Sequence, residues 1–77
     1  MNLYKFYSDT CQPCKALTEV LDELGVEHTA INIKDDMDTA IKYQVRNVPV
    51  LIDLDSDERL IGFSSKPKLE AWLGSLN

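Results

Sequence analysis

The chain has 77 residues and a formal net charge of −5, with 44% hydrophobic and 27% charged residues. We expect it to form a single domain over residues 1–77, which buries only about 60% of the surface that its unfolded chain exposes. The acidic charge argues against nucleic acid or an anionic membrane as a partner, and no apolar run approaches the roughly 20 residues of a membrane span.

The first half of the chain predicts a strand followed by an amphipathic helix. Leu3–Tyr7 is a short aromatic and aliphatic run of β character. A helix is predicted from Pro13, which suits the first helical turn, to Gly25, which suits the position after the C-cap. Its apolar side has the i, i+3, i+4, i+7 spacing of Leu17, Val20, Leu21 and Leu24. Its polar side carries Lys15, Thr18, Glu19, Asp22 and Glu23.

A second strand and a second helix follow. Val26–Ile33 predicts the strand, and Asp35-Asp36 offers an N-cap and acidic residues for the next helix. The apolar side of that helix is expected to consist of Met37, Ala40, Ile41 and Val45. A strand-helix-strand-helix order predicts parallel pairing of the two strands through a right-handed crossover.

The second half predicts a hairpin and a final helix. Val48–Ile52 forms the third strand, residues 53–58 an acidic turn, and Arg59–Gly62 the fourth strand. Ser64 or Ser65 caps the last helix, whose apolar side is Leu69, Trp72, Leu73 and Leu76. The resulting fold class is α/β: a βαβαββα chain with a four-stranded mixed sheet and helices on both faces.

The only two cysteines, Cys11 and Cys14, stand where the first strand leads into the first helix. Two intervening residues place both sulfurs in one helical turn, where they can cycle between dithiol and disulfide. A helix N-terminus favours a thiolate over a thiol. We therefore expect Cys11 to attack a disulfide sulfur and Cys14, one turn further in, to resolve the mixed disulfide.

Two alternative interpretations compete with redox chemistry. A zinc site needs about four ligands, but the chain offers one CxxC and a single histidine, His28. Cysteines also pack as inert core residues, although Pro13 and the helix terminus argue against this reading. A pair of this kind in a βαβ context is typical of redox chemistry in a reducing compartment. The first residues begin a strand and lack a signal-peptide layout, so a cytoplasmic location is expected.

Three segments together resemble the thioredoxin/glutaredoxin family, and the resemblance covers nearly the whole chain. Phe6–Lys15 is similar to the family's first strand, active-site loop and helix start. Tyr43–Pro49 resembles the segment that ends in its cis-proline, and Gly62–Lys66 resembles its glycine turn before the last helix. The resemblance implies a thioredoxin-like fold and a thiol–disulfide oxidoreductase.

The resemblance also implies roles for individual residues. Pro49 would be cis and pack against the cysteine pair, and the backbone of Val48 would pair with a substrate peptide or glutathione. Arg46, Gly62 and Phe63 are further candidates for substrate binding. No bound cofactor is implied beyond the redox-active disulfide Cys11–Cys14, and no metal.

Departures from the family pattern bear on the branch within it. Lys5 stands where thioredoxins usually carry a buried aspartate, and we expect its side chain to extend toward solvent or toward Cys14. Ser8 stands where glutaredoxins usually carry a basic residue for glutathione. The chain most resembles compact glutaredoxin-like thioredoxins, including electron donors of ribonucleotide reductase.

Partners follow from that resemblance. The upstream reductant would be thioredoxin reductase or glutathione, and the client a protein with a disulfide. Two other functions remain open: a glutathione-dependent glutaredoxin, and a redox-inert binding module on the same fold.

Overall fold

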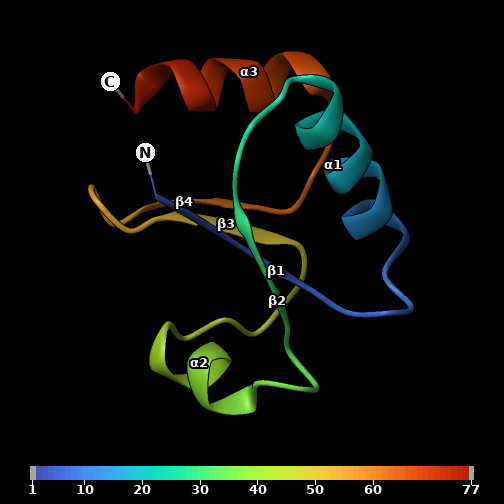
Figure 1. The fold of residues 1–77 in the computed structure, drawn as a ribbon, viewed down its shortest axis with the longest axis vertical. Helices are drawn as coiled ribbons and strands as arrows, with labels where there is room; N and C mark the ends of the chain where they lie inside the picture. The colour runs from blue at the N-terminus through green and yellow to red at the C-terminus, as the bar shows by residue number, and fades with distance from the viewer. Residues whose placement is uncertain (1, 77) are drawn as a thin grey trace.

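A computed structural model describes residues 2–76. Its elements are β1 (Leu3–Tyr7), α1 (Gln12–Glu23), β2 (Thr29–Asn32), α2 (Met37–Lys42), β3 (Val50–Asp53), β4 (Glu58–Ile61) and α3 (Lys66–Ser75). The sheet has the order β2-β1-β3-β4; β1 pairs in parallel with β2, and the other two pairings are antiparallel. Figure 1 shows α1 and α3 over one face of the sheet and α2 over the other. The predicted fold class is confirmed.

Each face of the sheet has its own hydrophobic cluster. Under α1 and α3, the buried residues are Leu17, Leu21, Leu51 and Leu69. On the α2 face they are Phe6, Ile31, Ala40, Val50 and Ile52. Successive side chains of a strand point to opposite faces, so β3 supplies residues to both clusters, and β1 sends Phe6 toward α2 and Lys5 toward α1.

Helix α1 ends as predicted, at a glycine in the left-handed region. Gly25 has φ +68°, its N–H donates to Asp22 O at 3.1 Å, and Val26 N–H donates to Leu21 O at 3.0 Å. These two bonds form a Schellman motif, and Val26 packs against the hydrophobic cluster that contains Leu21.

This motif also explains why the second strand is shorter than predicted. The expected strand Val26–Ile33 begins only at Thr29 and ends at Asn32, because Val26 is part of the helix stop. The predicted third strand Val48–Ile52 is observed at Val50–Asp53. The predicted fourth strand Arg59–Gly62 is observed at Glu58–Ile61, and Gly62 turns away with φ +81°.

The apolar side predicted for the second helix is partly wrong. Asp36 caps α2 as expected, but Met37 and Ile41 are 61% and 69% exposed. They lie four residues apart and share one side of the helix, whereas Ala40 lies on the buried side. Tyr43 and Val45, beyond the helix end, pack against the same cluster.

The last helix begins at Ser65, which decides between the two predicted caps: its Oγ accepts from Lys68 N–H at 3.4 Å. Leu69 is buried, and Trp72 and Leu73 pack against the cluster under α1 and α3. None of the helices in the described range 2–76 has the length and apolarity to span a membrane.

Candidate active site

The two cysteines form a disulfide at the start of α1, with their Cα atoms 5.2 Å apart. Cys11 is the N-cap residue with extended backbone (φ −88°, ψ 106°), and its Sγ accepts a hydrogen bond from Cys14 N–H at 3.1 Å. Cys11 is half-buried, whereas Cys14 is only 2% exposed. The predicted asymmetry is confirmed: an accessible sulfur lies at the helix terminus, and a buried sulfur one turn inside.

The loop before the cysteines is fixed at both ends. Cys11 N–H donates to Ser8 O at 3.3 Å. The side chain of Asp9 accepts a hydrogen bond from the amide of Asn32, a buried residue at the end of β2, at 3.1 Å. The strand β2, which pairs in parallel with β1, therefore fixes the position of the loop that precedes Cys11.

A second pair of predicted site residues meets at the hairpin. The Val48–Pro49 peptide bond is cis, as expected from the family resemblance. Pro49 is fully buried, and its carbonyl accepts a hydrogen bond from Gly62 N–H at 2.8 Å. Gly62 and Phe63 line a pocket of about 360 Å³ that continues to the start of α3.

The two remaining predicted site residues, Val48 and Arg46, make no hydrogen bond with the cysteine pair or with the Pro49–Gly62 pair in the described range 2–76. Val48 packs against the hydrophobic cluster on the α2 face. Arg46 is exposed and makes no hydrogen bond or ion pair with any residue between 2 and 76. In that same range, no hydrogen bond joins the cysteine pair to the Pro49–Gly62 pair.

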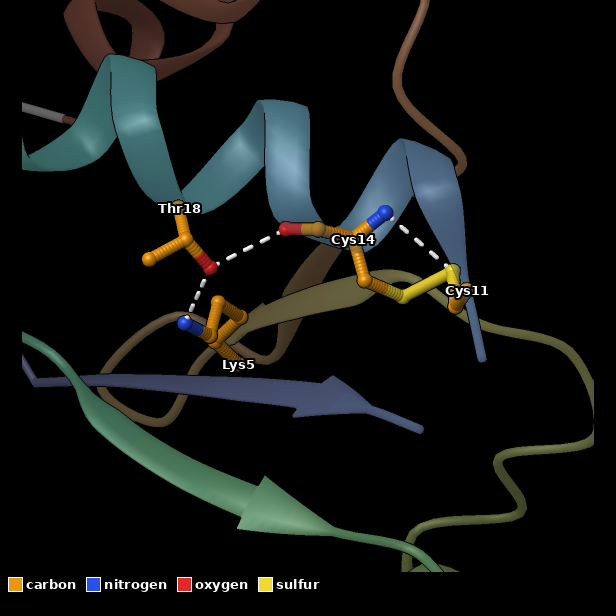
Figure 2. Close-up of a disulfide and its surroundings, with 4 residues drawn as sticks. All are labelled: Lys5, Cys11, Cys14 and Thr18. Atoms are coloured by element: carbon orange, nitrogen blue, oxygen red, sulfur yellow. Dashed lines mark hydrogen bonds between the residues drawn. A yellow bond between two sulfur atoms is a disulfide. The ribbon is translucent and has the colours of Figure 1, made fainter. Parts of the chain in front are cut away.

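Lys5 takes the second of its two expected orientations, toward the α1 turn that carries Cys14 (Figure 2). The residue is only 4% exposed, and its Nζ donates to Thr18 Oγ1 at 2.6 Å. Thr18 Oγ1 in turn donates to Cys14 O at 3.0 Å. Burial lowers the pKa of Lys5 below its ordinary 10.5, although the negative charge of Asp22 acts in the opposite direction.

Thr18 is the residue that the sequence pattern missed. Helical periodicity assigned it to the solvent side of the helix, but it is half-buried and faces β1. The available signal was Lys5 itself: a lysine facing α1 from a central strand needs an acceptor, and a hydroxyl on that helix can supply one.

A pocket of about 380 Å³ adjoins this arrangement. Its lining comes from β1, α1, β2 and the loop between β1 and α1, and includes Lys5, Tyr7, Asp9, Cys14 and Thr18. In the described part of the chain, no group of three or more His, Cys, Asp or Glu side chains could hold a metal ion.

Comparison with known proteins agrees with this geometry. The thioredoxin family model matches residues 1–75. Thioredoxin C-2 of Corynebacterium nephridii is 32% identical over 80 aligned residues, covering 92% of this chain and 74% of that protein. The thioredoxin of Pseudomonas aeruginosa gives the same identity and coverage.

Solved structures are similar as well. A point mutant of a thioredoxin from Halobacterium salinarum superposes with a TM-score of 0.81 at 28% identity, covering 96% of this chain and 72% of that one. The structural-genomics target XcR50 from X. campestris has a TM-score of 0.71 at 29% identity, with 95% and 96% coverage. The alignment therefore covers almost the whole length of XcR50.

A dithiol–disulfide pair at the N-terminus of a helix, carried on this sheet, defines the class of thiol–disulfide oxidoreductases. Within that class, the chain belongs to the thioredoxin family.

Proposed function

We propose that the protein reduces disulfide bonds in client proteins, with Cys11 as nucleophile and Cys14 as resolving thiol. In the first step the Cys11 thiolate attacks a client sulfur; a Cys11–client disulfide forms, the client disulfide breaks, and one client thiolate leaves. In the second step Cys14 attacks Cys11 Sγ and releases the other client thiolate. The client gains two electrons, and the Cys11–Cys14 disulfide of this structure is the product.

The observation that carries this proposal is the unequal environment of the two sulfurs. Cys11 is half-buried at the N-cap, where the Cys14 N–H already points at its Sγ. That N–H and the positive end of the helix dipole favour a thiolate at Cys11. Cys14 is too buried to meet a protein client directly, so its part is the intramolecular step.

We assign client docking to the neighbourhood of Pro49 and Gly62. The bond between Gly62 N–H and Pro49 O joins the segment before β3 to the turn after β4. The pocket lined by Gly62 and Phe63 offers apolar and backbone surface, and the backbone of Val48 is the proposed pairing edge. Exposed Arg46 is the candidate for a charged contact.

For the upstream reductant we favour thioredoxin reductase over glutathione. The relatives described above are thioredoxins, and Ser8 replaces the basic residue that the glutaredoxin pattern would supply for glutathione. Ribonucleotide reductase is a candidate client, and the cytoplasm a compartment in which such a pair would work.

Insulin-disulfide reduction tests the proposal. The protein is supplied with NADPH and either thioredoxin reductase or glutathione with glutathione reductase. We expect turnover with the first system, no activity in Cys11→Ser, and trapped mixed disulfides in Cys14→Ser. Retained activity in Cys11→Ser overturns the assignment of the nucleophile. Turnover only with glutathione identifies a glutaredoxin, and a pair that cannot be reversibly oxidised identifies a redox-inert binding module.

A further inference from the structure

The side chain of Lys5 is a buried cation that hydrogen bonds link, through Thr18, to the backbone of the resolving cysteine. It rises from β1, the strand that pairs with both β2 and β3, and is 4% exposed. Its Nζ binds Thr18 Oγ1, which binds the carbonyl of Cys14 (Figure 2). Lys5, Thr18 and Cys14 also line the same pocket of about 380 Å³. Burying a lysine costs free energy, and a role in the chemistry of that pocket is a physical reason for a lysine at this buried position.

The charged groups around this ammonium group, among residues 2–76, lie on α1 and on the pocket wall. The negative charge of Asp22, on α1, partly offsets the lowering of the Lys5 pKa by burial. Asp9 and Lys15 lie on the wall of the pocket, but Asp9 binds Asn32 and Lys15 is exposed. The ring of Tyr7 lies 5.4 Å from Nζ, a distance at which an aromatic face attracts a cation.

We propose that Lys5 is a positioning residue for the second redox step: its ammonium group stabilises the thiolate of Cys14. This inference rests on the proposed function, in which Cys14 resolves the mixed disulfide. When the mixed disulfide forms, Cys14 is left as a buried thiol, and it must lose its proton before it attacks. A buried anion is expensive unless a cation or a hydrogen-bond donor lies near it.

The resolving step balances without a further reactant. The Cys14 thiol releases its proton to solvent, and the electron pair of the thiolate forms the Cys14–Cys11 bond. The bond between Cys11 and the client sulfur breaks, and the client leaves as a thiolate that takes up a proton. Lys5 keeps its proton throughout; its positive charge lowers the free energy of the thiolate intermediate.

The test measures the Cys14 thiol by NMR of a labelled Cβ, in a Cys11→Ser background so that one thiol titrates alone. Adding Lys5→Met should raise the pKa of Cys14 by about 1, because a neighbouring positive charge favours the thiolate. Adding Lys5→Arg should keep it near the parent value. Lys15→Met is the matched control and should have a smaller effect, since an exposed charge is screened by salt. An unchanged or lower Cys14 pKa in Lys5→Met overturns the inference.

A second measurement needs no substitution at Lys5. Coupling between two sites is reciprocal, so a thiolate at Cys14 must raise the pKa of Lys5. We expect the Lys5 Nζ to titrate at higher pH in the reduced protein than in the disulfide form. Equal titration in the two redox states overturns the inference independently of any Lys5 variant.

The kinetic consequence separates this inference from the proposed function. Raising the pKa by 1 lowers the thiolate fraction about tenfold but raises its intrinsic nucleophilicity about threefold, so resolution at pH 7 should slow about threefold in Lys5→Met. Formation of the mixed disulfide by Cys11 should be little affected. If the wild-type protein fails to reduce insulin, the proposed function fails; if it reduces insulin and Lys5→Met resolves at the wild-type rate, only the role of Lys5 fails.

Discussion

The side-chain amide of Asn32 donates a hydrogen bond of 3.1 Å to Asp9 Oδ1 and so joins the end of β2 to the loop before Cys11. Asn32 is buried, and its own Oδ1 accepts from Lys34 N–H at 2.9 Å. The same end of β2 is also held by Ile33 N–H, which donates to Tyr7 O at 3.0 Å. The position of the cysteine loop thus depends on side chains and backbone of a strand that is distant in sequence.

This contact predicts the outcome of exchanging its two partners. Asn32→Asp places two carboxylates where a donor faced an acceptor, and should lower the free energy of unfolding at pH 7 by about 1–3 kcal/mol. Adding Asp9→Asn restores a donor and an acceptor with the direction reversed, and should recover most of that loss. Urea unfolding of the single and double variants measures both effects. A double variant no more stable than Asn32→Asp would show that the pair is not coupled.

Lys5 predicts a cost in stability at neutral pH. Its burial lowers its pKa, so the unfolded chain binds more protons than the folded one between the folded pKa and 10.5. Stability therefore rises with pH through that window, and the charged lysine is unfavourable below it. Lys5→Met should stabilise the oxidised protein at pH 7 by about 1–3 kcal/mol, with a smaller difference from wild type as the pH approaches 10.5. Urea unfolding at several pH values checks the sign, and a gap that widens with pH would contradict it.

The cap of α3 gives a prediction with a neighbouring control. Ser65 Oγ accepts from Lys68 N–H, whereas exposed Ser64 caps nothing in α3. Ser65→Ala should lower the free energy of unfolding by about 1 kcal/mol, and Ser64→Ala should change it by less than about 0.5 kcal/mol. Equal effects in urea unfolding would mean that the hydrogen bond at Ser65 does not stabilise the helix.

Local patterns in the sequence were sufficient to predict the redox pair and the fold. Spacing alone placed Cys11 and Cys14 on one turn, and Gly25 marked the helix end that the Schellman motif produces. The family resemblance supplied the cis bond before Pro49, which no local pattern favours. The periodicity of the sequence does not distinguish a thioredoxin from a glutaredoxin, because that distinction depends on which reductant and client the protein binds.

The rest depended on long-range contacts. The Lys5–Thr18 and Asp9–Asn32 bonds join residues 13 and 23 positions apart, and only the packing of α1 and β2 on β1 brings them together. The outward side of α2 was misassigned because a six-residue helix is too short for its periodicity to distinguish Met37 and Ile41 from core residues. Polar residues on a predicted solvent face, such as Thr18, gave no sign that a buried lysine lay opposite.

Gly62 and Gly74 predict opposite effects of the same substitution. Gly62 has φ +81°, and a Cβ there would meet no atom within 4 Å, so Gly62→Ala carries only backbone strain, about 1–2 kcal/mol. Gly74 lies in α3 with equal space, and Gly74→Ala should stabilise by up to about 1 kcal/mol. Because the added Cβ at Gly62 meets none of the described atoms beyond its chain neighbours within 4 Å, the substitution adds no new side-chain contact inside the protein. If the client docks beside Pro49, Gly62→Ala should raise KM for insulin, and Gly74→Ala should not. An unchanged KM at a temperature where both variants are folded would remove Gly62 from the docking surface.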